Sequence, residues 1–247
     1  MERCQVHSLV VPAHPDAESL THALAREVTA ALSGDERSAE LVDLAAEAFD
    51  PRFTRADLLH YRGEGPTPLD VVGEQARLDR AQQLVLVFPV CWWSMPALLK
   101  GWIDRVFING WAFEYSRSGR LVPKLDKLSV HLLAVAGGDA DGYERHGYAK
   151  ALRTQIERGI FGFCGASIAS TRIVYDSEAT SAEVLAAEVN SSAKHISTTA
   201  RRRRTVGCDA HREQRRRAPP RRPGQPSALS PRCARPRWGC GRSWGRV

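Results

Sequence analysis

Residues 83–107 read QLVLVFPVCWWSMPALLKGWIDRVF. Gln83–Pro89 is almost continuously apolar and ends at a proline, a pattern typical of a strand buried on both faces of a sheet. Met95–Phe107 then has apolar residues at helical spacing, with Pro96 in the first turn, where a missing N–H costs nothing. A buried strand followed directly by an amphipathic helix indicates one strand–helix unit of a parallel sheet.

The same unit recurs on both sides of this stretch. Further strands are predicted at Val6–Ala13, Ala39–Leu44, Lys127–Gly138 and Ala166–Asp176. Helical patterns cover Ser19–Ser33, Asp70–Gln82, Tyr148–Cys164 and Thr180–His195, and residues 45–68 are expected to be irregular. Five such units favour an α/β fold of the flavodoxin-like type over a barrel: a doubly wound, five-stranded parallel sheet of order 2-1-3-4-5 with helices on both faces.

The composition changes sharply near residue 199. Residues 201–247 hold fifteen Arg, no Lys, one Asp and one Glu, a net charge of +13; because the whole chain carries +7, residues 1–200 carry −6. We expect a flavodoxin-like domain over residues 1–198 and a disordered Arg- and Pro-rich tail over residues 199–247, since the tail has too few aliphatic residues to form a core.

Two interpretations of this tail compete. An arginine-rich arm could bind nucleic acid or an anionic membrane, because clustered Arg neutralises phosphates. Alternatively, the tail is an out-of-frame or extended translation of a GC-rich gene, which fits fifteen Arg without a single Lys. We favour the second interpretation and do not expect the tail to bind nucleic acid.

The six cysteines predict neither a disulfide framework nor a metal site. They are Cys4, Cys91, Cys164, Cys208, Cys233 and Cys240, and their spacings, even with His211, suit zinc poorly. We interpret Cys91 as a packing residue. The N-terminal apolar run is too short for a signal peptide, and no stretch reaches the ~20 apolar residues of a membrane helix, so we expect a cytoplasmic protein without membrane insertion.

In a doubly wound sheet, ligands bind beyond the carboxyl ends of the strands, beside the point where the strand order reverses. This rule selects a first loop (Ala13–Ser19), a second loop (Pro89–Ser94) and a third loop (Ala136–Tyr143). Ser19 could cap the helix that follows or, with Thr21, hold a phosphate; on this segment alone the cap is the simpler interpretation. Neither GxGxxG nor GxxxxGK[ST] occurs, which excludes the Rossmann fingerprint and the P-loop.

The second and third loops carry aromatic residues and glycines. Trp92 and Trp93 directly follow a buried strand, and since both cannot pack inward, they predict a stacking surface for a planar ring or a subunit interface. Gly137-Gly138 lets the backbone approach a ligand closely, and Tyr143 with His146 could donate protons.

The order of these motifs resembles that of a known family. His14-Pro15 with Ser19 five residues after the histidine, FPVCWWSMPALLKGWIDRVF (88–107), WAFEY (111–115) and AGGDADGY (136–143) resemble the NAD(P)H dehydrogenase (quinone) family. That family includes quinone reductases, modulators of drug activity and quinone reductase-like partners of potassium-efflux systems. The resemblance covers about Val6 to Lys194.

The resemblance implies a flavin site at the three loops. The implied cofactor-binding residues are His14, Ser19, Leu20, Thr21, Pro89, Val90, Cys91, Trp92, Trp93, Ala136, Gly137, Gly138 and Tyr143. The implied acceptor pocket comprises Trp93, Phe113, Tyr115 and Tyr143, with Phe113 and Tyr115 coming from a second subunit of a homodimer. Tyr143 and His146 would be the catalytic pair; His146 follows Tyr143 by three residues where the family has six, which gives it a secondary role.

The implied reaction is a two-electron, ping-pong NAD(P)H:quinone oxidoreduction. NAD(P)H passes a hydride to flavin N5, and a quinone or similar flat acceptor then takes the place of the nicotinamide. We expect FAD, because the HPDAES loop resembles that of FAD-binding members, with FMN as the alternative. Alternative functions are a flavin-binding regulatory partner of a potassium-efflux transporter and an FMN or azo reductase.

The homodimer expectation rests on the apolar seam of ALLKGWIDRVF and on the aromatics of WAFEY. On this helix, Lys100, Asp104 and Arg105 are expected on a solvated or interface-rim face, with a structural role.

Overall fold

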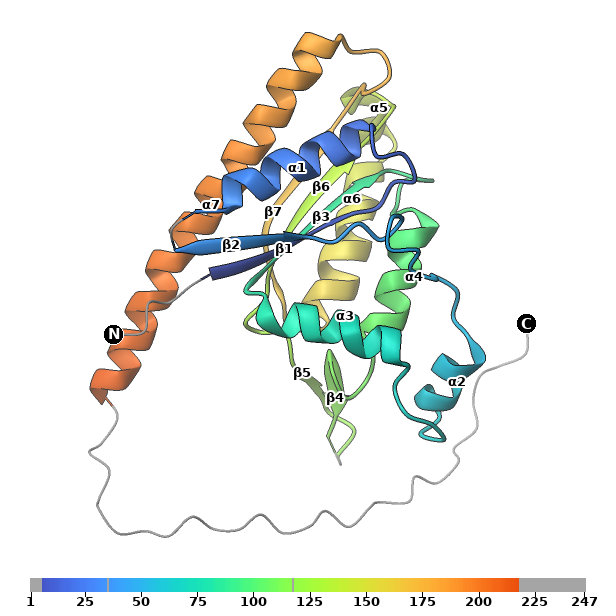
Figure 1. Cartoon of the computed structure of the whole chain (residues 1–247), viewed down its shortest axis with the longest axis vertical. Helices are drawn as coiled ribbons and strands as arrows, with labels where there is room; N and C mark the ends of the chain where they lie inside the picture. The colour runs from blue at the N-terminus through green and yellow to red at the C-terminus, as the bar shows by residue number, and fades with distance from the viewer. Residues whose placement is uncertain (1–5, 35, 117, 218–247) are drawn as a thin grey trace. The chain divides into compact units, whose positions relative to one another are not determined.

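The structure, a computed structural model, describes residues 6–34, 36–116 and 118–217, and their side chains as far as Ala200 (Figure 1). Five parallel strands form one sheet in the order β2-β1-β3-β6-β7. Their bounds are β1 Val6–Pro12, β2 Arg37–Leu41, β3 Gln83–Pro89, β6 Ser129–Val135 and β7 Ser167–Val174. The predicted flavodoxin-like sheet is confirmed, and its strand order reverses at β1, which lies between β2 and β3.

The predicted topology needs one correction. Between β3 and β6 the chain forms β4 (Phe113–Tyr115) and β5 (Leu121–Pro123), which pair antiparallel in a separate two-stranded ribbon. In chain numbering the sheet order is therefore 2-1-3-6-7 rather than 2-1-3-4-5. Strands of three residues are too short to show a recognisable alternation, which is why the sequence did not reveal the ribbon.

The helices match the predicted ones in part. They are α1 Leu20–Leu32, α2 Arg55–Tyr61, α3 Leu69–Arg80, α4 Ala97–Val106, α5 Ala140–Arg145, α6 Tyr148–Arg153, the π-helix η1 Thr154–Gly162 and α7 Ala182–Arg217. α2 was not predicted, although Thr54 and Asp57 form a capping box at its start. The predicted helix over 148–164 is divided between α6 and η1.

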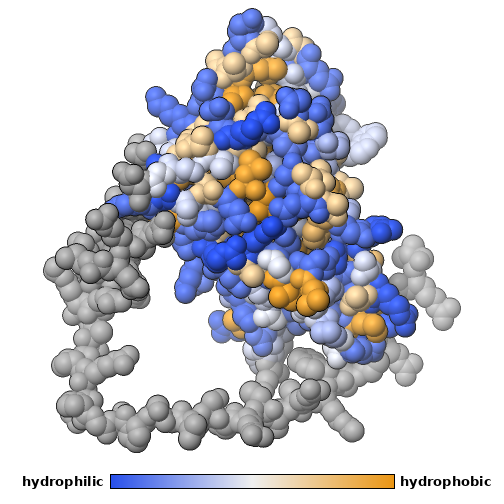
Figure 2. Space-filling model, viewed as in Figure 1, coloured by the Kyte–Doolittle hydropathy of each residue, from blue (hydrophilic) through white to orange (hydrophobic). Residues whose placement is uncertain are grey.

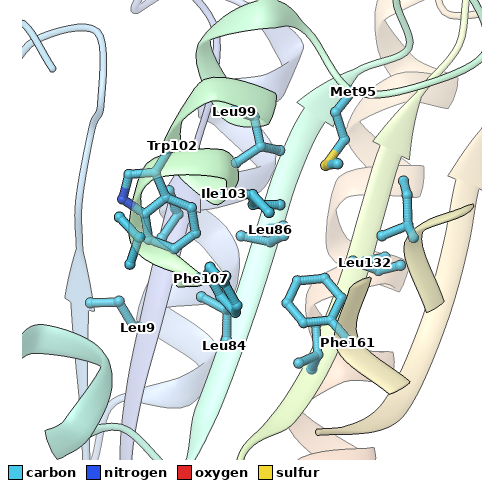
Figure 3. Packing of buried hydrophobic residues seen from close by; sticks show 14 of the residues in the cluster. Leu9, Leu84, Leu86, Met95, Leu99, Trp102, Ile103, Phe107, Leu132 and Phe161 are labelled. Carbon is cyan, nitrogen blue, oxygen red and sulfur yellow. The ribbon is translucent and has the colours of Figure 1, made fainter. Parts of the chain in front are cut away.

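Helices cover both faces of the sheet (Figure 1). On one face Leu84 and Leu86 lie beside residues of α4 and η1 (Figure 3). Phe88 and Leu78 of α3 belong to the same buried cluster. On the other face Val85 and Val87 pack against α1 and α7. Because successive side chains of a strand point to opposite faces, a strand between two helical layers must be apolar at nearly every position, as in Gln83–Pro89.

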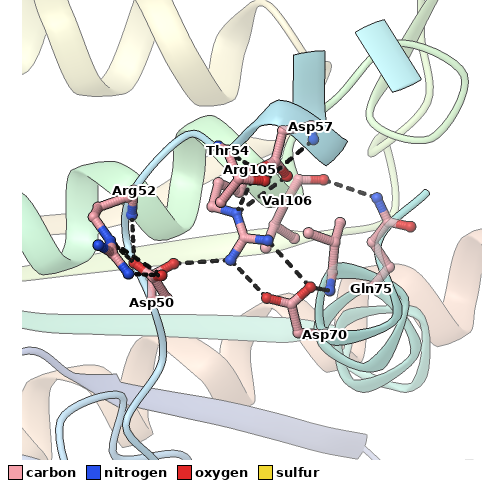
Figure 4. Close-up of polar contacts among 9 residues, drawn as sticks. Asp50, Arg52, Thr54, Asp57, Asp70, Gln75, Arg105 and Val106 are labelled. Atoms are coloured by element: carbon pink, nitrogen blue, oxygen red, sulfur yellow. Dashed lines mark hydrogen bonds and ion pairs between the residues drawn. The ribbon is translucent and has the colours of Figure 1, made fainter. Parts of the chain in front are cut away.

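A buried arginine ties α4 to the long connection between β2 and α3 (Figure 4). Arg105 Nε donates to both carboxylate oxygens of Asp57 at 3.1 Å. The two terminal nitrogens donate to Asp70 at 2.6 and 3.1 Å, and one of them also donates to the carbonyl of Asp50 at 2.8 Å. The expectation that Arg105 lies on a solvated or rim face is therefore wrong, since its side chain is 3% exposed.

Lys100 and Asp104 do lie on the surface, as expected. Lys100 and Asp104 are exposed and pair with each other at 2.6 Å along the same helix. The sequence could not distinguish Arg105 from them, because its carboxylate partners come from α2 and α3, which lie far from Arg105 in the sequence.

Gly101 allows the same connection to approach α4 closely. A Cβ at this position would lie 2.1 Å from the carbonyl oxygen of Pro51 and 2.5 Å from its Cβ. No larger residue fits without moving the backbone, because real Cβ atoms do not come that close to other heavy atoms.

The last helix extends beyond its predicted end. We expected it to stop at His195 and disorder to begin at residue 199, but α7 continues as helix to Arg217, and Ala200 packs in the apolar cluster beside α1. No proline occurs between residues 182 and 217, and Arg is a good helix former. Residues 218–247, with the rest of the expected tail, lie outside the described residues. The first compact unit of the chain ends at Gly207, and a domain boundary at 198 stays a prediction.

The surface seen in Figure 2 is mainly hydrophilic and is interrupted by small apolar patches. Among residues 6–34, 36–116 and 118–217, no helix combines the length and the hydropathy needed to cross a bilayer.

Candidate functional site

The three loops start at the same end of the sheet, where the carboxyl ends of β1, β3 and β6 lie; this end is called the loop edge. The backbone hydrogen-bond ladder continues past the strand ends and joins the start of each loop to the end of the adjacent strand. The bonds run from Ala13 N–H to Val87 (3.0 Å), from Val90 N–H to Val135 (2.7 Å) and from Ala136 N–H to Val174 (2.7 Å). The predicted site residues of these loops are thus brought to the same edge, where the strand order reverses.

The first loop ends in the predicted helix cap. Ser19 Oγ accepts the backbone N–H of His22 at 3.3 Å, which confirms Ser19 as the N-cap of α1. The N–H groups of Leu20 and Thr21 form no hydrogen bond within the part of the chain that the structure describes. His14 is half-buried beside them, and its Nδ1 accepts the N–H of Asp16 at 3.0 Å. Two free donors at a helix start can bind an anion.

The second loop is a tight turn around the two tryptophans. Cys91 and Ser94 exchange backbone hydrogen bonds of 2.9 and 3.0 Å, and Trp92 and Trp93 between them have φ angles of 48° and 57°. This left-handed conformation costs a residue other than glycine about 1–2 kcal/mol. Trp92 is 88% exposed and Trp93 38%. Their N–H groups have no partner among the described residues, so the turn presents two indole rings and two free donors.

A tyrosine that the sequence did not single out lies against this turn. The ring of Tyr148 lies 4.2 Å from that of Trp93 and 5.3 Å from that of His146, at interplanar angles of 30° and 28°. Tyr148 therefore lies between the two predicted residues and covers one face of Trp93. The only sequence signal was its position, two residues after His146.

The third loop is held by the segment that follows β7. Asp176 N–H donates to Gly138 and Ser177 N–H donates to Ala136, each at 3.1 Å. A Cβ at Gly137 would lie 3.2 Å from the carboxylate of Glu178, so glycine keeps this approach open. The N–H groups of Gly137 and Gly138 make no hydrogen bond to any described residue.

Tyr143 is buried beneath this loop, with 7% of its surface exposed. Its ring meets those of Tyr148 and Tyr175 edge-on at 5.9 and 5.2 Å. Burial, and then the neighbouring Tyr175, raise the pKa of the Tyr143 hydroxyl above its usual value. Tyr143 is therefore a neutral hydrogen-bond donor at physiological pH. His146 is exposed, and its ring stacks on that of Tyr148, which in turn lies edge-on to Tyr143.

Phe113 and Tyr115 are not brought to this edge. β3 ends at the second loop, α4 runs back along the sheet, and the β4–β5 ribbon follows α4 at the opposite end (Figure 1). Within one chain these two aromatics are therefore separated from Trp93 and Tyr143. The pocket predicted from Trp93, Phe113, Tyr115 and Tyr143 is therefore not formed within one chain.

The donors present fit a flavin nucleotide. Backbone N–H groups without a partner in the described part of the chain occur in pairs at Leu20-Thr21, Trp92-Trp93 and Gly137-Gly138, one pair in or directly after each loop. A flavin needs donors for its phosphate and for the polar edge of its ring, together with an aromatic surface for the ring plane. The exposed Trp92 supplies such a surface.

Comparison with known proteins identifies the fold family of the chain. The pattern of one family, described as having the flavodoxin-like fold, matches residues 7–196. The chain belongs to the flavodoxin-like fold family. The match begins in β1 and ends within α7, so it covers all three loops.

Relatives of this flavodoxin-like chain carry the names of quinone-reducing dehydrogenases. Ribosyldihydronicotinamide dehydrogenase [quinone] of Pongo abelii is 31% identical over 197 residues, which cover 71% of this chain and 84% of that protein. NAD(P)H dehydrogenase [quinone] 1 of Cavia porcellus is 29% identical over 188 residues, 68% of each chain. A solved NAD(P)H:quinone oxidoreductase from Methanothermobacter marburgensis superposes with a TM-score of 0.69 at 23% identity, covering 77% of this chain and 94% of that one, and shares the fold.

The described cysteines of this flavodoxin-like chain differ in exposure. Cys91 was interpreted as a packing residue, but its side chain is exposed at the rim of the tryptophan turn. Cys164 is buried, which raises the pKa of its thiol to about 11 and leaves it protonated. Among the described residues, no group of three His, Cys, Asp or Glu side chains is arranged to hold a metal ion.

Proposed function

We propose that the chain is a flavin-dependent NAD(P)H:quinone oxidoreductase. The observation that carries the proposal is a set of three N–H pairs at the edge where the strand order reverses, none of which has a partner among the described residues. It is supported by relatives, named as quinone-reducing dehydrogenases, that align over more than two thirds of the chain.

The first loop and the start of α1 would hold the phosphate. The N–H groups of Leu20 and Thr21 and the hydroxyl of Ser19 converge there, and His14 lies beside them. The positive end of the α1 dipole adds to this attraction. We propose FAD as the cofactor, because the first loop resembles that of FAD-binding members, with FMN as the alternative.

The second and third loops would hold the ring. Trp92 offers its exposed indole face, and Pro89 and Val90 bring the turn to the end of β3. The N–H groups of Gly137 and Gly138 would stabilise negative charge on the polar edge of the ring.

When bound, a flavin supplies a two-electron carrier between a dihydronicotinamide and a quinone. The chain's own residues orient the reactants and exclude water. Tyr143, kept neutral by burial, would donate a hydrogen bond to an oxygen of the acceptor. Tyr148 would hold Trp93 and His146 in place on the acceptor side.

A homodimer would complete the acceptor pocket. Phe113 and Tyr115 lie at the far end of their own sheet and would reach the site of the second copy. A cytoplasmic location stays a prediction.

The test is the visible absorption spectrum of the purified protein. We expect flavin bands at about 375 and 450 nm that bleach when NADPH is added without oxygen and return when a quinone is added. Gly137→Val, which places a side chain among the proposed donors, should lose the bands. Gly73→Ala, on the open surface of α3, should keep them.

The other outcomes of this test would either refute the proposal or indicate a different function. A protein that stays colourless after incubation with FAD or FMN would refute the proposal. Flavin that bleaches but is reoxidised by azo dyes rather than quinones would indicate an azo reductase. Flavin that is bound but hardly reduced would favour the regulatory partner of a transporter.

A further inference from the structure

His22, in the first turn of α1, is bonded at both ring nitrogens although only 4% of it is exposed. Its Nδ1 lies 3.1 Å from Ser19 Oγ, and its Nε2 lies 2.8 Å from Asp43 Oδ2. The three side chains form a line that starts at the carboxylate after β2 and ends at the hydroxyl proposed to face the phosphate. None of the motifs in the sequence included His22 or Asp43.

Asp43 is held as a carboxylate. Its Oδ1 accepts the backbone N–H groups of Ala45 and Ala46 at 3.0 and 3.1 Å. Burial alone would raise the pKa of the Asp43 carboxyl, but the hydrogen bonds from Ala46 and His22 outweigh it and lower the pKa. The ring of His22 therefore always meets a negative acceptor at Nε2, which fixes a proton on that nitrogen.

The proton on the other ring nitrogen decides what Ser19 can do. In the neutral ring, Nδ1 has no proton and accepts the Ser19 O–H, so the hydroxyl proton points away from any ligand. In the cationic ring, Nδ1–H donates to Ser19 Oγ instead, and the hydroxyl proton becomes free to donate outward. The cation also places a positive charge behind the first turn of α1.

Few other titratable groups face this ring. His14 from the first loop lies edge-on to His22, with ring centroids 6.4 Å apart. Other charged residues of the first loop and the first two turns of α1 are Asp16, Glu18, Arg26 and Glu27, and Arg26 donates to the carbonyl of Ala17. On the Asp43 side, the backbone N–H of Glu47 donates to the carbonyl of Asp43 at 2.9 Å. Among the described residues, His14 is the histidine whose ring lies against that of His22, so a test must separate the two.

We propose that Asp43 and His22 position the Ser19 hydroxyl, and that His22 takes up a proton when the phosphate of a flavin nucleotide binds at the start of α1. This inference rests on the proposed function. Both residues are positioning residues, since they act on the ligand through Ser19 and through charge.

Protonation linkage gives the test. Apoprotein is titrated with FAD, and with riboflavin as a ligand that lacks phosphate, at about pH 6 and pH 8. FAD has no group that titrates in this interval, so a change in its affinity reports on the protein. We expect the Kd for FAD to increase by about tenfold from pH 6 to pH 8, and that for riboflavin by less than about twofold. Calorimetry in two buffers of different ionisation enthalpy should show proton uptake with FAD alone.

Three variants locate the proton. His22→Gln cannot change charge, so its FAD affinity should be the same at both pH values. In Asp43→Asn the amide oxygen keeps the bonds to Ala45 and Ala46, and the amide nitrogen donates to Nε2. That donation forces the proton onto Nδ1, so Asp43→Asn should bind FAD at pH 8 at least as tightly as the wild type.

His14→Gln is the matched control. It should bind FAD less tightly at both pH values and keep the tenfold ratio. If His14→Gln loses the ratio while His22→Gln keeps it, or if wild-type affinity for FAD is the same at both pH values, the inference is overturned.

Failure of the proposed function looks different. If neither FAD nor FMN binds at any pH, the flavin assignment fails and the inference with it. If FMN binds instead of FAD, the comparison is made between about pH 7 and pH 8.5, above the second pKa of its phosphate near 6. FMN affinity that does not change over that interval overturns the inference and leaves the flavin assignment intact.

Discussion

The loop edge of the sheet and the layer around α4 differ in whether their polar groups have hydrogen-bond partners. Around α4, Arg105 is enclosed and every acidic neighbour drawn in Figure 4 is bonded. At the loop edge, backbone N–H groups are left without partners in the described chain, and Trp92 and Trp93 are held in a costly backbone conformation.

This contrast separates stability from function within one domain. An ion pair that is fully satisfied stabilises a long connection but offers nothing to a ligand. Free donors and strained, exposed aromatics lower stability, and they persist where a ligand uses them. The following variants test whether the two regions can be changed independently.

The largest effect is expected at the α4 layer. Arg105→Met would leave the Asp57 carboxylate buried without its cation, which costs about 3–5 kcal/mol of unfolding free energy. Urea unfolding of the apoprotein at neutral pH measures the loss. Lys100→Met, which breaks the exposed pair on the same helix, should change stability by less than about 1 kcal/mol.

The ion pair of Asp57 and Arg105 also predicts how the stability of the fold depends on pH. Burial would raise the pKa of the Asp57 carboxyl, but hydrogen bonds from Thr54 and Arg105 outweigh it and hold the pKa below 3.8. A lowered folded-state pKa stabilises the fold above the unfolded-state value and loses that contribution as pH falls. The stability gap between wild type and Arg105→Met should therefore narrow below about pH 4. A gap that stays constant with pH would show that the charge of Asp57 is not involved.

A smaller effect on stability is expected where Gly101 of α4 lies close to Pro51. Gly101→Ala would put a Cβ 2.1 Å from the Pro51 carbonyl, and the required backbone shift should cost about 2–3 kcal/mol. Gly73→Ala in α3 meets nothing within 4 Å and should stabilise by about 0.5–1 kcal/mol. Thermal unfolding of both variants measures the difference, and equal melting temperatures would contradict the role of Gly101.

The smallest change in stability is expected at the loop edge. Trp92→Gly removes the left-handed strain without removing buried surface, so the apoprotein should gain about 1 kcal/mol or stay unchanged. Its affinity for flavin should fall by about tenfold or more because the stacking surface is lost. A Trp92→Gly variant that loses stability and keeps its flavin would show that Trp92 stabilises the fold and does not bind the ligand.

The sheet could be predicted because its signal is local. Gln83–Pro89 has the same bounds in the sequence prediction and in β3, since burial on two faces requires a continuous apolar run. Ser19 could be predicted as a cap for a similar reason, since a hydroxyl just before an apolar helical pattern has a short-range partner.

Features that depend on distant partners could not be predicted. Asp43 follows β2 and reaches His22 only when β2 lies beside β1. The strain at Trp92 and Trp93 comes from a turn whose ends are Cys91 and Ser94, and no residue in that turn is a usual left-handed residue. The extension of α7 was missed for another reason, since a polar, Arg-rich composition was interpreted as disorder although it also suits a helix.

The opposite ends occupied by the ribbon and the loops have a consequence for mixed assemblies. In the proposed dimer each chain would lend Phe113 and Tyr115 to its neighbour and receive the neighbour's pair in return. A chain damaged at its loops and a chain damaged at its ribbon would each be inactive alone. Combined in one dimer, they would form one intact pocket and one doubly damaged pocket. A substitution in one chain would thus inactivate a pocket that contains the loops of the other chain. Activity regained on mixing two inactive proteins would show that the pockets are shared.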